Sequence, residues 1–157
     1  MILKYRCKED TKEIRIFGDK FVKNNQSHCK LSINDKKLDL VAILKIKPGF
    51  IINNIITITL KKVEKIKDMS SMFQECTALE NIESITDIIK DKITNMSSMF
   101  YGCTSLKDCS ELTKINTKNV TDIATTLSTA TTPARNVLPF LLFFLGAYLT
   151  SFILSAL

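Results

Sequence analysis

The sequence predicts an α/β repeat solenoid with a β-rich N-terminal cap and a C-terminal apolar helix. Three observations favour this fold class: a motif that occurs twice, a front segment of alternating polar and apolar residues, and an uncharged run at the end. The motif occupies residues 69–79 and returns at residues 96–106, which is 27 residues further along. A self-match at a period of about 20–50 residues is typical of stacked repeats.

Both copies of the motif read Met-Ser-Ser-Met-Phe-x-x-Cys-Thr-x-Leu. Met, Met, Phe and Cys fall at i, i+3, i+4 and i+7, which predicts one buried face of a short helix. Asp68 and Asn95 precede the two copies and are predicted helix caps, because a side-chain oxygen accepts from the free N–H groups of a first turn. The predicted repeat core is Met69, Met72, Phe73, Cys76 and Leu79, followed by Met96, Met99, Phe100, Cys103 and Leu106.

The front segment, residues 1–62, is predicted to be a β-rich cap or leader. An open solenoid end exposes the apolar edge of its first coil, so repeat arrays need a different, polar-faced cap. Alternation and β-branched residues predict strands, and Asn, Asp, Pro and Gly predict the turns between them. The expected elements are strands over 13–17, 29–33, 38–43 and 55–60, a short helix capped by Asp19, and turns at 34–35 and 48–49.

The end of the chain is predicted to leave the repeat pattern. A third copy begins at Val120 but lacks the second Met and the Phe, so the repeats are assigned to 63–127 and a linker to 128–136. Residues 137–157 carry no charge, and 21 helical residues at ~1.5 Å each span a hydrocarbon core of roughly 30 Å. We therefore expect a transmembrane helix, a single-pass C-terminal anchor that places the protein at a membrane, with the repeats facing either the cytosol or the cell surface.

Two other interpretations of this end remain open. Ser128-Thr129-Ala130 are small residues followed by a polar spacer and an apolar tail, as in a lipid-anchor signal. That route requires translocation, and the charged N-terminus has no apolar segment typical of a secretory signal. The apolar run also fits a buried helix, although its aromatic residues are distributed all around the helix.

Composition argues against several classes of function. Residues 1–67 hold 16 Lys and Arg against 7 Asp and Glu, yet they lack a basic helix with interleaved aromatics, so no nucleic-acid partner is expected. The five cysteines include no Cys-x-x-Cys pair, and His28 is the only histidine. This pattern predicts neither a metal site nor a catalytic nucleophile with its base. We expect no enzyme activity and no cofactor.

The motif, preceded by Ile or Val, then Thr or Lys, then Asp or Asn, resembles the BspA-like leucine-rich repeat family. The resemblance covers residues 63 to about 127, with two good copies and one degraded copy. It implies a short right-handed leucine-rich-repeat solenoid in a surface protein. Such proteins function in protein binding or adhesion, without known catalysis.

The leading hypothesis is a non-enzymatic protein-interaction module, held on a membrane through residues 137–157 and binding an unknown protein partner. The alternatives are a truncated or degenerate repeat protein with no independent binding function, or a lipid-anchored surface protein. Because the recurring residues are expected in the core, binding is expected at variable positions between them. The predicted binding surface is Gln74, Glu75, Glu80, Tyr101 and Lys107.

Overall fold

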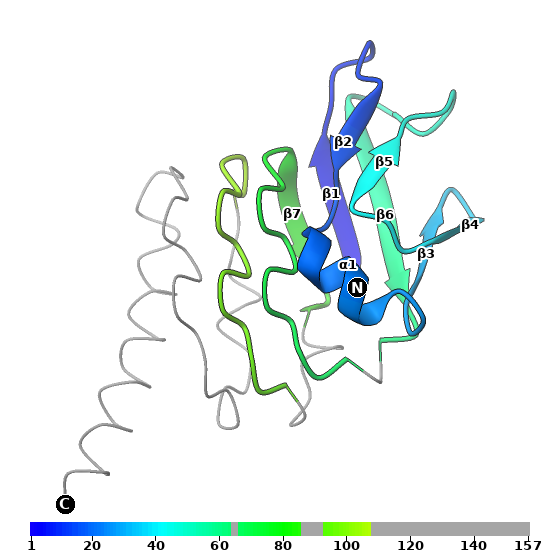
Figure 1. Ribbon diagram of the computed structural model, residues 1–157. Helices are drawn as coiled ribbons and strands as arrows, with labels where there is room; N and C mark the ends of the chain where they lie inside the picture. The colour runs from blue at the N-terminus through cyan, green and yellow to red at the C-terminus, as the bar shows by residue number, and fades with distance from the viewer. Residues whose placement is uncertain (64–65, 86–92, 108–157) are drawn as a thin grey trace, which may run out of the picture.

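A five-stranded antiparallel sheet carries most of the fold in the computed structural model, which describes residues 1–63, 66–85 and 93–107. Its strand order is β4-β3-β6-β1-β7, so the strand from the first repeat copy lies beside the N-terminal strand (Figure 1). A second sheet pairs β2 with β5. The strands are β1 (Ile2–Arg6), β2 (Glu13–Arg15), β3 (Lys30–Ile33), β4 (Lys36–Asp39), β5 (Ile43–Lys45), β6 (Ile55–Lys61) and β7 (Leu79–Glu83).

Strict alternation explains why the central strands form. In β6, Ile56, Ile58 and Leu60 are buried, while Thr57 and Lys61 between and beside them are exposed. Successive side chains of a strand point to opposite faces, so one face of β6 is apolar and the other polar. The neighbouring strand has the same arrangement, and the register places Leu3 opposite Ile58 and Tyr5 opposite Ile56.

The β3–β4 hairpin confirms one predicted turn and corrects the strand after it. Asn34 and Asp35 have φ values of 46° and 62°, as a two-residue turn of the hairpin type requires. The expected return strand over 38–43 is wrong, because β4 ends at Asp39 and β5 begins at Ile43 in the other sheet. Leu40, between them, is fully buried, so the chain turns inward there and leaves the sheet edge.

A second layer covers the apolar face of the large sheet. It consists of the β2–β5 pair and helix α1 (Asp19–Asn25), whose Phe21 is buried. The Tyr5 hydroxyl donates to the carbonyl oxygen of Ile16 at 2.5 Å and ties the two layers together. Burial, with smaller contributions from neighbouring thiols, raises the pKa of Tyr5 well above its ordinary value. Asp19 is not the helix cap: the cap residue is Gly18, without a side-chain hydrogen bond.

The predicted repeat helices are wrong. The first copy is a run of turns from Ser70 to Glu75, and the second copy has turns over the matching residues. Ser71 and Glu75 have positive φ, as do Ser98 and Gly102 at the equivalent positions, and a right-handed helix cannot contain such residues. Consecutive turns bring the same four positions inward as a helix would, which is why the spacing misled the prediction.

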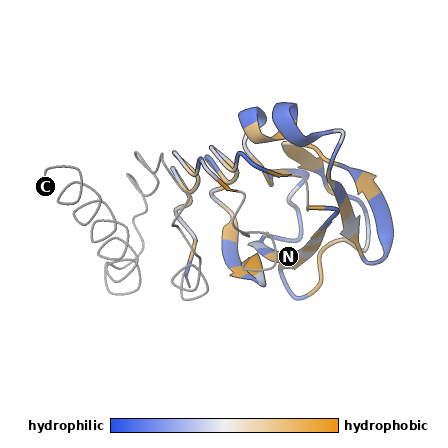
Figure 2. Ribbon diagram, turned by 90° about the horizontal axis from the view of Figure 1, so that it is seen from below, coloured by the Kyte–Doolittle hydropathy of each residue, from blue (hydrophilic) through white to orange (hydrophobic). Residues whose placement is uncertain are grey.

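The predicted fold class is therefore corrected. The described residues form mostly antiparallel sheet with one short helix, and they contain no leucine-rich-repeat solenoid. The strand of the first copy pairs antiparallel with β1, so the repeat extends the front sheet. The domain division between residues 1–62 and 63–127 stays a prediction, although both segments contribute to one hydrophobic cluster. Figure 2 shows the two copies as adjacent loops beside the sheet.

The expected C-terminal membrane helix and the membrane localisation are also corrected. Within residues 1–63, 66–85 and 93–107, no helix is long and apolar enough to cross a membrane. The third copy, the linker and the apolar run 137–157 all lie outside the described residues.

Gly18 allows the front segment and the first repeat copy to meet at close range. Its N–H donates to the carbonyl oxygen of Met72 at 3.0 Å. A Cβ atom at Gly18 would overlap the carbonyl oxygen of Ser71 and lie 3.3 Å from the Cβ of Gln74. The φ of Gly18 is −73°, so the requirement for glycine comes from space and not from backbone conformation.

We predict that Gly18→Ala lowers the free energy of unfolding by about 1–3 kcal/mol, because the added methyl group overpacks a contact between two backbones. Urea unfolding followed by far-UV circular dichroism measures the change. Gly49→Asn is the control, since Gly49 has φ +82° with nothing within 4 Å, and asparagine tolerates such a conformation. A stability of Gly18→Ala equal to that of wild type would show that the two segments do not meet there.

Candidate functional site

The two repeat copies are joined by a regular backbone ladder. Alternate N–H groups of the first copy donate to carbonyl oxygens of the second, so the copies lie parallel and in register. Within each copy, further i to i+3 bonds close the successive turns, such as that from Met72 to Met69 at 3.2 Å. The ladder pairs are Met69–Asn95 at 2.9 Å, Ser71–Ser97 at 2.8 Å, Phe73–Met99 at 2.9 Å and Glu75–Tyr101 at 2.7 Å.

The inner side of this ladder is apolar and closed to solvent. All ten residues of the predicted repeat core are at most 1% exposed. The rings of Phe73 and Phe100 stack with centroids 5.5 Å apart. The Cys103 thiol donates to the carbonyl oxygen of Phe73 at 3.0 Å, and burial raises the pKa of Cys76 well above its ordinary value. Both thiols are therefore packing groups that are closed to solvent.

Asp68 and Asn95 begin the two copies with the same local bond. The Asp68 carboxylate accepts from the N–H of Ser70 at 2.7 Å, and the Asn95 amide oxygen accepts from the N–H of Ser97 at 2.9 Å. A side-chain oxygen that accepts from the backbone two residues on forms an Asx turn. Successive turns follow both residues, so Asp68 and Asn95 each begin the series of turns in their copy.

Part of the predicted binding surface forms one exposed ridge. Tyr101 is 36% exposed and Glu75 is exposed, while Gln74, at the position in the first copy that Tyr101 holds in the second, is half-buried. Thr77 and Thr104, one residue beyond the cysteine of each copy, are also exposed. The repeat ridge is defined here as Gln74, Glu75, Thr77, Tyr101 and Thr104.

Glu80 and Lys107 lie instead in an ion cluster with Arg6. Oε1 of Glu80 accepts from Nη2 of Arg6 at 2.8 Å and from Nζ of Lys107, and the Glu80 side chain is only 11% exposed. The hydrogen bond from Arg6, more than any other contact, lowers the pKa of Glu80. Glu80 thus joins β1 to both repeat copies. Arg6 had no signal in the sequence, because its partner lies 74 residues away.

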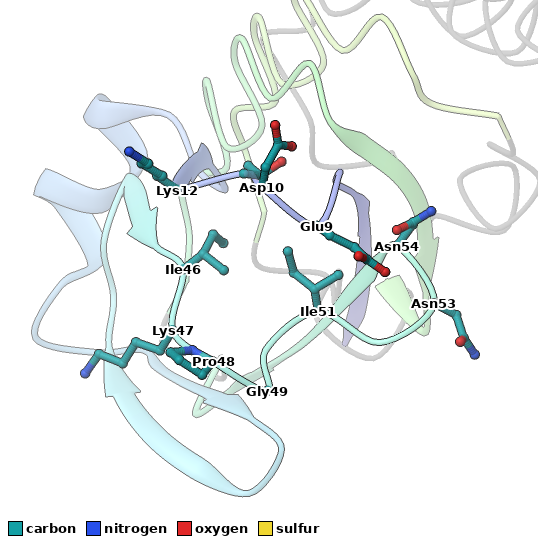
Figure 3. A pocket seen from close by; sticks show the side chains of 11 residues that line it. Glu9, Asp10, Lys12, Ile46, Lys47, Pro48, Gly49, Ile51, Asn53 and Asn54 are labelled. Atoms are coloured by element: carbon teal, nitrogen blue, oxygen red, sulfur yellow. The ribbon is translucent and has the colours of Figure 1, made fainter.

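An open hollow of about 440 Å³ lies between the loop after β1 and the loop before β6 (Figure 3). Ile46 and Ile51 project into it, and Glu9 lies at its border. The charged side chains of Lys12 and Lys47 point away from the opening, so they do not converge on one ligand group. Among the described residues, no three His, Cys, Asp or Glu side chains are grouped so that they would hold a metal ion.

We predict that Glu80 contributes stability that disappears in acid. Its folded-state pKa is lowered, so its contribution is complete above its ordinary pKa of 4.5 and is lost as the pH falls through the lower folded value. Urea unfolding of wild type and Glu80→Gln from pH 7 to pH 3 measures the difference in unfolding free energy. That difference shrinks below about pH 4.5. A difference independent of pH would show that Glu80 is not a charged bridge.

In a comparison with known proteins, one family model matches the part of the chain that carries the repeats. The family model described as Mycoplasma protein of unknown function, DUF285, matches residues 49–139, which is more than half of the chain. The match includes β6, β7 and both described repeat copies. No curated protein and no solved structure matches the chain. The chain therefore belongs to the DUF285 family.

Proposed function

We propose that this chain is a non-enzymatic protein-interaction module whose repeats, of the BspA-like leucine-rich type, bind a protein partner through the repeat ridge. The observation that carries the proposal is an exposed tyrosine on a rigid backbone. Tyr101 is one of three large apolar or aromatic side chains that are exposed among the described residues, and the only one on the repeats.

Rigidity supports this role for the ridge. The carbonyl oxygen of Tyr101 accepts from the N–H of Glu75, and the N–H of Tyr101 donates to the carbonyl oxygen of Ser98 at 3.2 Å. The backbone that carries the ring is therefore fixed on both sides. Tyrosine is enriched among residues that dominate binding energies, since it covers a large area with little side-chain entropy to lose.

The polarity of the ridge fits a protein partner. Around Tyr101 lie a glutamine, two threonines and a single charge, that of Glu75. An aromatic centre with a mostly uncharged polar rim is the usual composition of a non-obligate interface. A stable interface buries about 800 Å² on each partner, so the ridge supplies its centre and neighbouring surface supplies the rest.

The test places a photoreactive benzoylphenylalanine at position 101 of the full chain in the cells that produce it. We expect a crosslinked product of discrete mass, because the ring lies at the centre of the interface. The same group at Ile43, which is 45% exposed on β5, is the matched control. No product from position 101, or identical products from both positions, would favour the alternative of a degenerate repeat protein without independent binding.

With the crosslinked partner purified, we predict that Tyr101→Ala weakens its binding by about 2 kcal/mol, as for a central aromatic residue. This corresponds to a roughly thirtyfold increase in Kd, measured by isothermal titration calorimetry. Ile43→Ala serves as the control and leaves Kd unchanged. Equal affinities of wild type and Tyr101→Ala would exclude the ridge as the interface.

A further inference from the structure

We propose that the β4 edge of the large sheet is a second interaction surface, which binds an acidic, extended segment of a partner protein. This surface lies on the front segment, at the opposite end of the sheet from β7 and the repeats (Figure 1). It is therefore separate from the repeat ridge. The proposal rests on three lysines that share one sheet face and on the free side of β4.

The three lysines lie on the solvent face of neighbouring strands. The register places Lys30 on β3 directly opposite Lys61 on β6, and Ser32 opposite Lys37 on β4. Leu31 and Leu60, which alternate with these residues, are buried on the other face. The basic corner is defined here as Lys30, Lys37 and Lys61.

The basic corner is not neutralised within the described structure. Lys30 pairs with Asp39 at 2.6 Å, and this hydrogen bond lowers the pKa of Asp39. Lys37 and Lys61 have no ion-pair partner among the described residues. Asp39 offsets the charge of Lys30 alone, so the charges of Lys37 and Lys61 remain to attract the carboxylates of a partner.

Other charged residues near the basic corner leave the net charge of this region positive. Asp35 lies in the hairpin turn, Lys36 follows that turn, and Lys62 comes directly after the end of β6. Together with the basic corner and Asp39 they make five lysines against two aspartates, and all seven residues are exposed. An anionic partner is thus attracted to this corner.

The edge strand explains why the partner is an extended peptide. In a two-residue hairpin the residues beside the turn form a bonded pair, so Ile33–Lys36 and Leu31–Leu38 are bonded and Lys37 and Asp39 direct their backbone groups outward. In the described part of the chain, no backbone bond joins this outer side to another segment. A partner strand can pair there.

Two other anionic partners fit the surface less well. Single-stranded nucleic acid is bound with aromatic side chains on which bases stack, and the basic corner contains none. Interfacial membrane binding uses exposed large apolar side chains, and those found among the described residues are Ile43, Ile52 and Tyr101, none of them in the corner.

The experiment uses the full chain and a fluorescent peptide of alternating threonine and glutamate, whose carboxylates all lie on one face of a strand. Fluorescence anisotropy at low salt measures binding. A peptide of the same sequence with every glutamate N-methylated has the same charge but lacks the backbone donors that would face β4, so it binds more weakly if strand pairing contributes. Equal binding of the two peptides would overturn the edge-strand part of the proposal.

A pair of charge-reversed variants tests the site itself. Lys37→Glu with Lys61→Glu is expected to weaken peptide binding at least about tenfold, since two attractive contacts become repulsive. Lys20→Glu with Lys23→Glu makes the same charge change on α1, where both lysines are exposed, and is expected to have little effect. Equal losses in both variants would reduce the effect to net charge and overturn the proposal.

Two further probes separate the partner classes. Phosphatidylserine vesicles and an oligouridine are titrated into the wild-type chain under the same conditions. The proposal expects both to bind more weakly than the threonine–glutamate peptide. Tighter binding of either probe, lost in Lys37→Glu with Lys61→Glu, would reassign the basic corner to a lipid surface or to nucleic acid.

Discussion

The rest of the structure depends on one contact between the front segment and the first repeat copy. There, aromatic rings of the two segments pack together and their backbones are hydrogen-bonded. Phe17 packs between Phe21, whose ring is tilted against it, and Phe73, whose ring stacks on it, with ring centroids 5.5 Å and 5.8 Å away. Phe73 continues the row to Phe100. The N–H of Gly18 bonds to the first copy beside this row. Pairing of β1 with β7 closes the other side, so neither segment completes its core alone.

Strands with a period of two were predictable, and contacts between distant segments were not. Alternation and the Asn34–Asp35 turn identified β3 and β6 because these signals are local. The prediction of repeat helices was wrong because successive turns bury the same positions as a helix does. Gly102, at the position equivalent to Glu75, was the one local sign of a positive φ. Glu80 was predicted to lie on a binding surface, since its ion pair with Arg6 joins residues 74 positions apart and has no local signal in the sequence.

The family match and the structure divide the chain differently. The match begins at residue 49 and includes only β6 among the first six strands of the chain, whereas the structure adds β1 to β5 to the same core. The recurrent apolar residues of the repeats form the interior, whereas the variable Gln74, Glu75 and Tyr101 form the ridge together with the recurrent Thr77 and Thr104. In this account the front segment completes the core of the first copy and carries its own basic corner at the far edge.

The central claim is that the front segment and the repeats fold as one unit. Amide hydrogen exchange under native conditions tests it most directly, because it reports the opening free energy of each backbone bond. We predict that the ladder amides of Ser71 and Phe73 are protected to the same level as those of Leu3 and Ile58 in the central strands. Ladder amides that exchange much faster than the central strands would contradict it.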